Sequence, residues 1–597
     1  MQTQTLAIVP DIPAPDPSAP AAWWRYATEV LDHVRMPYRT ASTLDPQALS
    51  GDTGLVLIAH HSGLDTAARD RLTTWVNDGG AVVIVGDPGD LAGLAGSTGT
   101  TSLSTDDGTD HGHVNVHAHD VWTHVPDVAL HAVGGVRLDA ADDVDVLASW
   151  EDGGAAVTVR RVGSGVVITC GVDLWRTIVR IQQGYPVTAD GVPASDGSAP
   201  LDEGILKCED GMALCLERDR ALPPGEPELG TYEHTNPPAS GLPMFHRPHA
   251  DLWRSLFLQC VWWAAEQVDL AQPWLYYWPA GISAVAHMSH DADLGVDEQG
   301  RAALEAFGEA DVKVTWCQVF PGGYEPETFA EVGRAGHEQA LHYNAMHDAD
   351  IATWGWPQMR AQYAWAQAVT GVDEIVSNKN HYTRWEGFTE FYDWCERLGI
   401  QIDQSRGPSK QGTVGFPFGT AHVYFPIADA DDGHRFYDVL SLPLHTQDLA
   451  WAGHESIRDV ILDNAIEQHG VAHFLFHGPH LLMRPPTRKA CLALADEARR
   501  RGLPWWTSKQ INDWERLRRK VELTVRATGD GWQIASSSEQ PVPGAAIMLM
   551  LPGVERAPRV VSGTGSADTV ERHGRTFVQL TVDVPAGTGE WKLEAAN

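Results

Sequence analysis

The sequence predicts an α/β multidomain protein, because short apolar strands alternate with helices in two separate stretches and the last stretch contains strands alone. The chain has 597 residues, of which 43% are hydrophobic and 20% are charged, so every part can form a core. At about 150 residues per domain, this length allows three or four domains. We expect four consecutive parts, which are 1–185, 186–279, 280–520 and 521–597.

The first part, 1–185, has the pattern of a doubly wound parallel sheet. Helical spacing at 21–34 and 66–77 separates apolar strand-like runs at 5–10, 54–59 and 81–86. This stretch resembles the class I glutamine amidotransferase-like domains, whose active members carry a Cys on the sharp turn after a central strand. Here the turn after 81–86 reads Asp87-Pro88-Gly89, with no nucleophile. The resemblance therefore implies an accessory or assembly domain without amidotransfer, through which the protein could form a homo-oligomer.

The remaining parts differ in composition. Residues 186–279 are rich in Pro, Gly and acidic residues, which predicts a loop-rich extension followed by a connecting helix over 249–268. In 280–520 strands and helices alternate again, and we expect strands at 282–288 and 313–319. From 521 onward Val, Thr and Leu alternate between Gly and Pro turns, which predicts a small β-sandwich.

The charge excludes some partners. There are 43 Lys and Arg residues against 79 Asp and Glu residues, a formal net charge of −36. Nucleic acid needs a basic surface to displace its counterions, so we expect no nucleic-acid partner. No run of about 18 apolar residues occurs, so we expect no membrane span. The first residues lack the pattern of a leader peptide, which favours a cytoplasmic protein, or a secreted one if a leader has been removed.

Carboxylates and imidazoles gather in the third part. Asp291 and Asp293 follow the strand predicted at 282–288, where α/β barrels place their chemistry. Three histidines, His337, His342 and His347, fall within residues 336–347, and a later apolar strand ends in His477. One carboxylate and two imidazoles form a ligand set for a hydrolytic metal such as Zn²⁺, with positions left for water and substrate.

These motifs resemble those of the NodB-homology polysaccharide deacetylases (carbohydrate esterase family 4 and relatives). Ser289-His290-Asp291-Ala292-Asp293 is similar to the first motif, Gly336-His337-Glu338 opens the second, and Leu475-Phe476-His477 matches the last. The resemblance implies a distorted (β/α) barrel. It also implies Asp291 as catalytic base and His477 as general acid, with Asp293, His342 and His347 as metal ligands.

Several assignments stay open. The family's two ligand histidines are four residues apart, whereas His342 and His347 are five apart, and the pair His337 and His342 has the same spacing. The basic residue that steadies Asp291 could be Lys379 or Arg384. The carboxylate that orients His477 could be Asp403 or Asp448, of which Asp448 is preferred. The residues expected to bind substrate are Arg384, Trp385, Asp448 and Trp451.

The function that this resemblance implies is metal-dependent removal of N-acetyl groups from amino sugars of an oligo- or polysaccharide. Zn²⁺ is the expected metal, with Co²⁺, Ni²⁺ or Fe²⁺ as alternatives. Two other classes remain open. The same barrel could act on another amide, a cyclic amide or an O-acetyl ester, or the protein could bind carbohydrate without catalysis.

Overall fold

The computed structural model describes residues 5–595 with internal gaps, and it shows a mixed α/β protein as predicted. The gaps are 11–22, 42–43, 45–48, 50–52, 61–63, 104–109, 199–203, 226–240, 347–352, 410–411, 430–431 and 555. The chain folds into two compact units that interleave along the sequence. The terminal unit comprises Met1–Val179, Leu252–Gly281 and Arg516–Asn597, and the central unit comprises Arg180–Asp251 and Ile282–Glu515.

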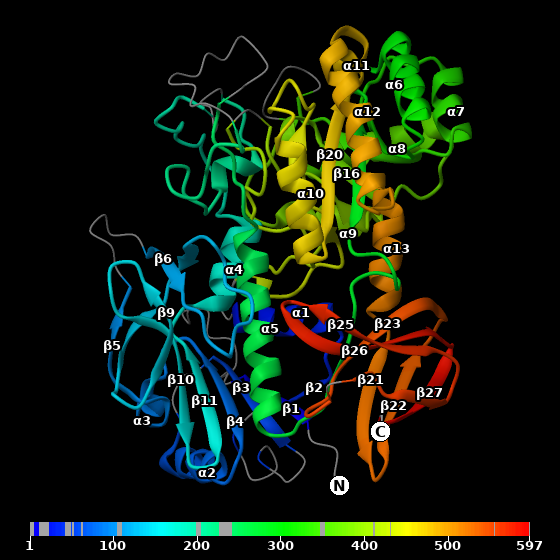
Figure 1. The fold of residues 1–597 in the computed structure, drawn as a ribbon. Coiled ribbons are helices and arrows are strands. Elements are labelled where there is room, and N and C mark those ends of the chain that lie inside the picture. Colours follow the sequence, from blue (N-terminus) through cyan, green and yellow to red (C-terminus); the bar gives the residue numbers. More distant parts are fainter. Residues whose placement is uncertain are drawn as a thin grey trace. The chain divides into compact units, whose positions relative to one another are not determined.

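The terminal unit contains an 11-stranded sheet whose main path runs β2-β1-β3-β4-β11-β10-β9-β6-β7 (Figure 1). The ladders from β2 to β11 are parallel and those from β11 onward are antiparallel. The first strands and helices are β1 (Thr5–Pro10), α1 (Tyr26–His33), β2 (Tyr38–Thr40), β3 (Thr53–His60), α2 (Thr66–Asn77) and β4 (Ala81–Val85). The later strands of this path are β6 (His111–Val116), β7 (Leu130–Val133), β9 (Asp145–Trp150), β10 (Ala155–Val162) and β11 (Gly165–Cys170). Off the path, β5 (Ser97–Ser102) pairs with β8 (Val136–Ala140), which also pairs with β10.

Helix α2 shows why this region folds as its pattern predicts. The carboxylate of Asp65 accepts a hydrogen bond from the backbone N–H of Ala68 at 2.7 Å, which caps the helix start. The helix then buries Leu72 and Val76 in a cluster with apolar residues of β3 and β4. The apolar face of a helix and the buried face of a parallel sheet thus form one core.

Two four-stranded antiparallel sheets complete the terminal unit, with the orders β12-β23-β26-β25 and β21-β22-β27-β24. Their strands are β12 (Gln272–Leu275), β21 (Glu522–Thr528), β22 (Gly531–Ser538), β23 (Val542–Met550), β24 (Arg559–Ser562), β25 (Ser566–Arg572), β26 (Arg575–Val584) and β27 (Gly587–Glu594). Strand β12 pairs with β23, so a strand that lies between the two segments of the central unit in the sequence joins strands that follow the second segment. Helix α5 (His249–Gln267) also lies mostly in this unit.

The central unit contains an eight-stranded parallel sheet with the order β18-β17-β16-β15-β14-β13-β20-β19. Its strands are β13 (Val285–Asp291), β14 (Thr315–Val319), β15 (Glu338–Tyr343), β16 (Ser377–Asn380), β17 (Ile402–Asp403), β18 (Leu440–Ser441), β19 (Thr446–Gln447) and β20 (Val471–His477). Its main helices are α6 (Asp297–Glu309), α7 (Pro326–Arg334), α8 (Trp356–Thr370), α9 (Glu390–Leu398), α10 (Ile457–Gln468), α11 (Gly478–Met483) and α12 (Pro485–Arg500). Over the described residues, no ladder joins β18 to β19.

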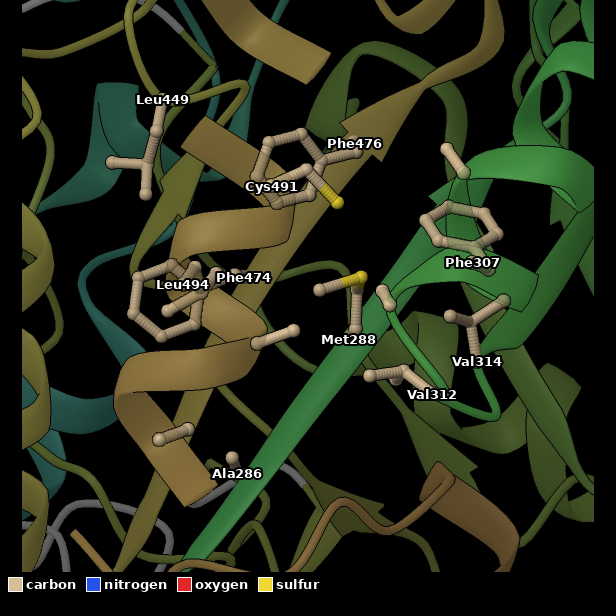
Figure 2. Packing of buried hydrophobic residues seen from close by; sticks show 14 of the residues in the cluster. Ala286, Met288, Phe307, Val312, Val314, Leu449, Phe474, Phe476, Cys491 and Leu494 are labelled. Atoms are coloured by element: carbon tan, nitrogen blue, oxygen red, sulfur yellow. The ribbon is translucent and has the colours of Figure 1, made fainter. Parts of the chain in front are cut away.

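Strand β13 has two faces of different chemistry. Ala286 and Met288 pack with Phe474 of β20 and with Cys491 and Leu494 of α12 in a cluster of fully or nearly fully buried side chains (Figure 2). His287, Ser289 and Asp291, which alternate with these residues along β13, are polar and also buried. Because side chains alternate along a strand, one face supplies the core and the other a polar interior that leads to Asp291.

No described helix is long and apolar enough to cross a membrane.

Candidate metal centre and active site

Four parallel strands bring the candidate site together at their carboxyl ends. Asp291 is the last residue of β13 and His477 is the last residue of β20, and the two are register partners. His342 is the penultimate residue of β15 and pairs in register with Lys379 of β16. Since all these strands run parallel, their carboxyl ends lie at one edge of the sheet, where α/β enzymes hold their catalytic groups.

Asp293, His342 and His381 could hold a metal ion, because their ligand atoms all lie within 4.8 Å of one another. The Nε2 of His342 lies 3.4 Å from Oδ1 of Asp293, and the Nε2 of His381 lies 3.5 Å from the same oxygen. One carboxylate and two imidazoles on one side of a site are typical of hydrolytic metal centres.

The hydrogen bonds around this triad fit a cation. The Nδ1 of His342 donates to the backbone carbonyl of Lys379 at 2.9 Å, so its Nε2 carries a lone pair. The Nδ1 of His381 lies 3.1 Å from Oδ1 of Asn344, which orients the second imidazole in the same way. Both the Nε2 of His342 and the Oδ1 of Asp293 are buried without a hydrogen-bond partner in the described structure. A buried unsatisfied polar atom costs about 1–3 kcal/mol, which a bound metal would offset.

Asp291 lies beside the triad as an anion. Its Oδ2 is 3.4 Å from Nζ of Lys379 and 3.5 Å from Nε2 of His342. Burial acts to raise the pKa of Asp291, but the electrostatic influence of His342, Lys379 and His477 outweighs it, so the pKa lies below the usual range. Of the two basic residues considered in the sequence, Lys379 is the one in contact with Asp291.

His477 is oriented by Asp448. The Nδ1 of His477 lies 2.5 Å from Oδ2 of Asp448, and the backbone N–H of His477 donates to the other oxygen at 2.9 Å. Burial acts to lower the pKa of His477, but the carboxylates of Asp448 and Asp293 outweigh it and raise the pKa to about 9. Asp403, the alternative partner, instead accepts hydrogen bonds from Asn378 and Ser405.

The other histidines of the second motif are placed differently. His347 lies outside the described residues. His337 precedes β15, where its Nδ1 accepts from the backbone N–H of Val314 at 3.1 Å and its ring packs on Trp316. Five residues of extended chain span roughly 16 Å, so His337 and His342 lie at opposite ends of the strand. The two members of the alternative ligand pair, His337 and His342, therefore lie far apart in this structure.

The residues expected to bind substrate fall into two groups. Arg384 and Trp385 are buried, and the Nη1 of Arg384 donates to the carbonyl of Ala345 at 3.0 Å. The guanidinium of Arg406 lies over the Trp385 ring, 4.2 Å from the ring centroid. The Nε1 of Trp385 donates to the backbone carbonyl of Phe388. Both side chains make contacts within the protein, and their role in binding a sugar stays a prediction. Trp451 is half-buried and packs on His480 with ring centroids 4.4 Å apart.

His381 was not predicted as a ligand. It directly follows β16, just as Asp291 and His477 end their own strands. The signal that could have found it is therefore its position after a strand of the same sheet. Strand β16 itself could not be predicted from apolar residues, because its four residues, Ser377 to Asn380, are all polar.

Two exposed apolar residues follow metal-ligand candidates directly. Leu294 (φ 61°) follows Asp293 and is 72% exposed, and Tyr382 (φ 60°) follows His381 and is 42% exposed. A left-handed backbone at a non-glycine residue costs about 1–3 kcal/mol and is frequent at functional sites. Lys207 of the loop-rich extension lies over the Tyr382 ring, with Nζ 5.8 Å from the ring centroid.

Comparisons with known proteins find similarity in structure alone. No family model and no curated protein matches the chain. A protein named as a polysaccharide deacetylase, from Mycobacterium smegmatis, is 15% identical, with 40% of this chain and 93% of that chain covered and a TM-score of 0.32. A ThuA-like protein from Bacteroides uniformis is 13% identical, with 29% and 83% covered and a TM-score of 0.23. A β-galactosidase from Bacillus circulans sp. alkalophilus is 13% identical over 30% of each chain, with a TM-score of 0.23.

Proposed function

We propose that this protein is a metal-dependent hydrolase that removes N-acetyl groups from amino sugars of an oligo- or polysaccharide. The observation that carries the proposal is the cluster of Asp293, His342 and His381 beside Asp291 and His477, with buried ligand atoms that lack hydrogen-bond partners in the described structure. The donor set suits Zn²⁺, and also Co²⁺, Ni²⁺ or Fe²⁺. A cation bound there would polarise the acetyl carbonyl and lower the pKa of the attacking water.

The base in this mechanism is Asp291. It is ionised at neutral pH because its pKa lies below the usual range, and its Oδ1 has no hydrogen-bond partner in the described structure. That oxygen takes a proton from the water that attacks the acetyl carbon. Lys379 holds the other oxygen of Asp291 at 3.4 Å and balances the charge of the carboxylate.

The acid is His477. The Asp448 carboxylate raises the pKa of His477, which favours the protonated imidazole at neutral pH. Its Nδ1 is held by Asp448, so Nε2 is the atom that can donate a proton to the departing sugar nitrogen. The C–N bond breaks as that nitrogen takes the proton, and the products are acetate and a free amine. General acid catalysis of this kind contributes about 10²–10⁴-fold.

We also propose a fold for three parts of the chain. We infer that 280–520 forms a NodB-type barrel, that 521–597 is a β-sandwich, and that 1–185 is an amidotransferase-like accessory domain through which the protein could assemble. The absence of a nucleophile at Asp87 supports an accessory role. Size-exclusion chromatography with light scattering of the full chain and of a chain lacking 1–185 tests the assembly role.

The experiment that tests the activity measures acetate release from N-acetylglucosamine and N-acetylgalactosamine oligomers, with Asp291→Asn as the control. We expect zinc-dependent release by the native chain and almost none by the variant. Release from O-acetyl esters or cyclic amides alone would favour another substrate class. Tight glycan binding without any release would favour a non-catalytic carbohydrate-binding protein.

A further inference from the structure

A cavity of about 570 Å³ in the central unit has not been assigned a role. Its apolar lining includes Met483, Pro485 and Pro486, and its polar lining includes His454 and Arg484. This volume lies within the range of about 300–1,000 Å³ that ligand pockets occupy.

The cavity adjoins the acid side of the candidate site. Helix α11 begins directly after His477 and ends at Met483, and six helical residues span about 9 Å. The lining also includes Ala450, two residues after Asp448. The segments that carry the acid and its carboxylate partner therefore continue into the cavity walls.

A series of contacts links the acid to the cavity. His480 lies 2.8 Å from the carboxylate of Asp448, which also holds His477. The Trp451 ring packs on His480 at 4.4 Å, and the guanidinium of Arg484 lies 5.9 Å from the centroid of the same ring. Trp451 thus contacts both His480, beside the acid, and Arg484, which lines the cavity.

The lining has the chemistry of a sugar-binding surface. Met483 is 65% exposed, and Pro485 and Pro486 are also exposed, although apolar side chains are normally buried. Exposed apolar groups that gather beside a site mark a ligand-binding surface. A pyranose ring offers an apolar C–H face for such residues and hydroxyl groups for Arg484 and His454.

We propose that this cavity is a subsite for the sugar unit next to the one that loses its acetyl group, so that the substrate is an oligomer and not a single sugar. The inference rests on the proposed function, because it assigns the subsite to the same reaction. A sugar unit bound in the subsite holds the substrate oligomer across the active site, which raises kcat/KM for oligomers above that for the monomer.

The test compares kcat/KM for an N-acetylhexosamine monomer and its tetramer, using the sugar that the native protein deacetylates fastest. We expect Met483→Glu to lower kcat/KM for the tetramer about 10-fold and to leave the monomer unchanged. Arg484→Ala, which changes the polar edge, is expected to act in the same direction. The matched control is Val146→Glu in the terminal unit, where an apolar side chain of 38% exposure receives the same charge.

A binding measurement separates this inference from the proposed function. Calorimetry of the tetramer with Asp291→Asn, and with Asp291→Asn combined with Met483→Glu, measures the subsite without turnover. Weaker tetramer binding in the double variant supports the subsite. If both variants bind it equally, or if Met483→Glu lowers monomer and tetramer turnover alike, the subsite is wrong while the hydrolase stands. If no glycan is bound or hydrolysed, both proposals fail.

Discussion

Two parallel strands in this protein end in an aspartate-containing turn, yet only one of the two turns belongs to a candidate site. After β4 in the terminal unit, Asp87 is exposed and its Oδ1 accepts a hydrogen bond from the backbone N–H of Gly89 at 3.0 Å. At the end of β13 in the central unit, Asp291 is buried and lies within 3.5 Å of both Lys379 and His342. The first aspartate shapes a turn, and the second is held among charges.

The neighbouring strands explain the difference. Strand β11, beside β4, ends in Cys170, and burial raises the pKa of this thiol to about 12, so it is no nucleophile at neutral pH. The strands of the central sheet instead contribute His342, Lys379 and His477 to the same edge. The edge of a parallel sheet therefore becomes a site only where several adjacent strands end in complementary groups.

Removal of a ligand is expected to have the largest effect. His342→Ala and His381→Ala each delete one of three donors, so we expect the Kd for Zn²⁺ to rise at least about 100-fold and acetate release to fall to background. Metal content after dialysis, measured by mass spectrometry, checks this. If His347→Ala loses the metal while His381→Ala keeps it, the third ligand is wrong; His337→Ala should behave like the native chain.

Removal of the base is next in size. Asp291→Asn keeps the shape of the side chain but cannot accept the proton, so we expect kcat to fall about 10²–10⁴-fold with metal content unchanged. The matched change in the other turn, Asp87→Asn, should leave kcat unaltered. An equal loss of kcat in the two variants would show that Asp291 has no special role compared with Asp87.

A smaller effect is expected from Lys379. Lys379→Met removes the ammonium that holds Asp291 but keeps the length of the side chain, and we expect kcat to fall about 10–100-fold with little change in KM. The backbone carbonyl that orients His342 remains in this variant. An unchanged kcat would show that Lys379 has no part in positioning the base.

The smallest effect concerns pH. The Asp448 carboxylate raises the pKa of His477, so Asp448→Asn lowers that pKa and the acid loses its proton at a lower pH. We expect the alkaline limb of the kcat profile to move toward neutral pH. A limb that stays in place would mean that His477 does not supply the proton.

Local pattern was sufficient for the parts of the fold that follow apolar periodicity. Helix α2 matches the expected 66–77, and β3 and β4 lie at the expected runs. The pairing of β12 with β23 could not be predicted, because the partners are more than 250 residues apart and short strands carry no sign of their neighbour. The chain forms two units that interleave along the sequence, and the four-part division stays a prediction.

The candidate site likewise contains residues that an apolar pattern could locate and residues that it could not. Asp291, Asp293 and His477 stand at or just after strands with apolar runs, so their location was visible in the sequence. His381 follows β16, whose residues Ser377 to Asn380 are polar although all are buried. The role of Trp385 stays a prediction, because residue type alone does not distinguish a tryptophan that stacks on a sugar from one that packs in a core.

Zinc titration of chelator-stripped protein, followed by acetate release from an N-acetylhexosamine oligomer, tests the central claim most directly. The stripped protein is expected to be inactive, and activity should return in proportion to added Zn²⁺ and level off at one equivalent per chain. Full activity in excess chelator, or zinc binding that leaves acetate release at zero, would contradict the account.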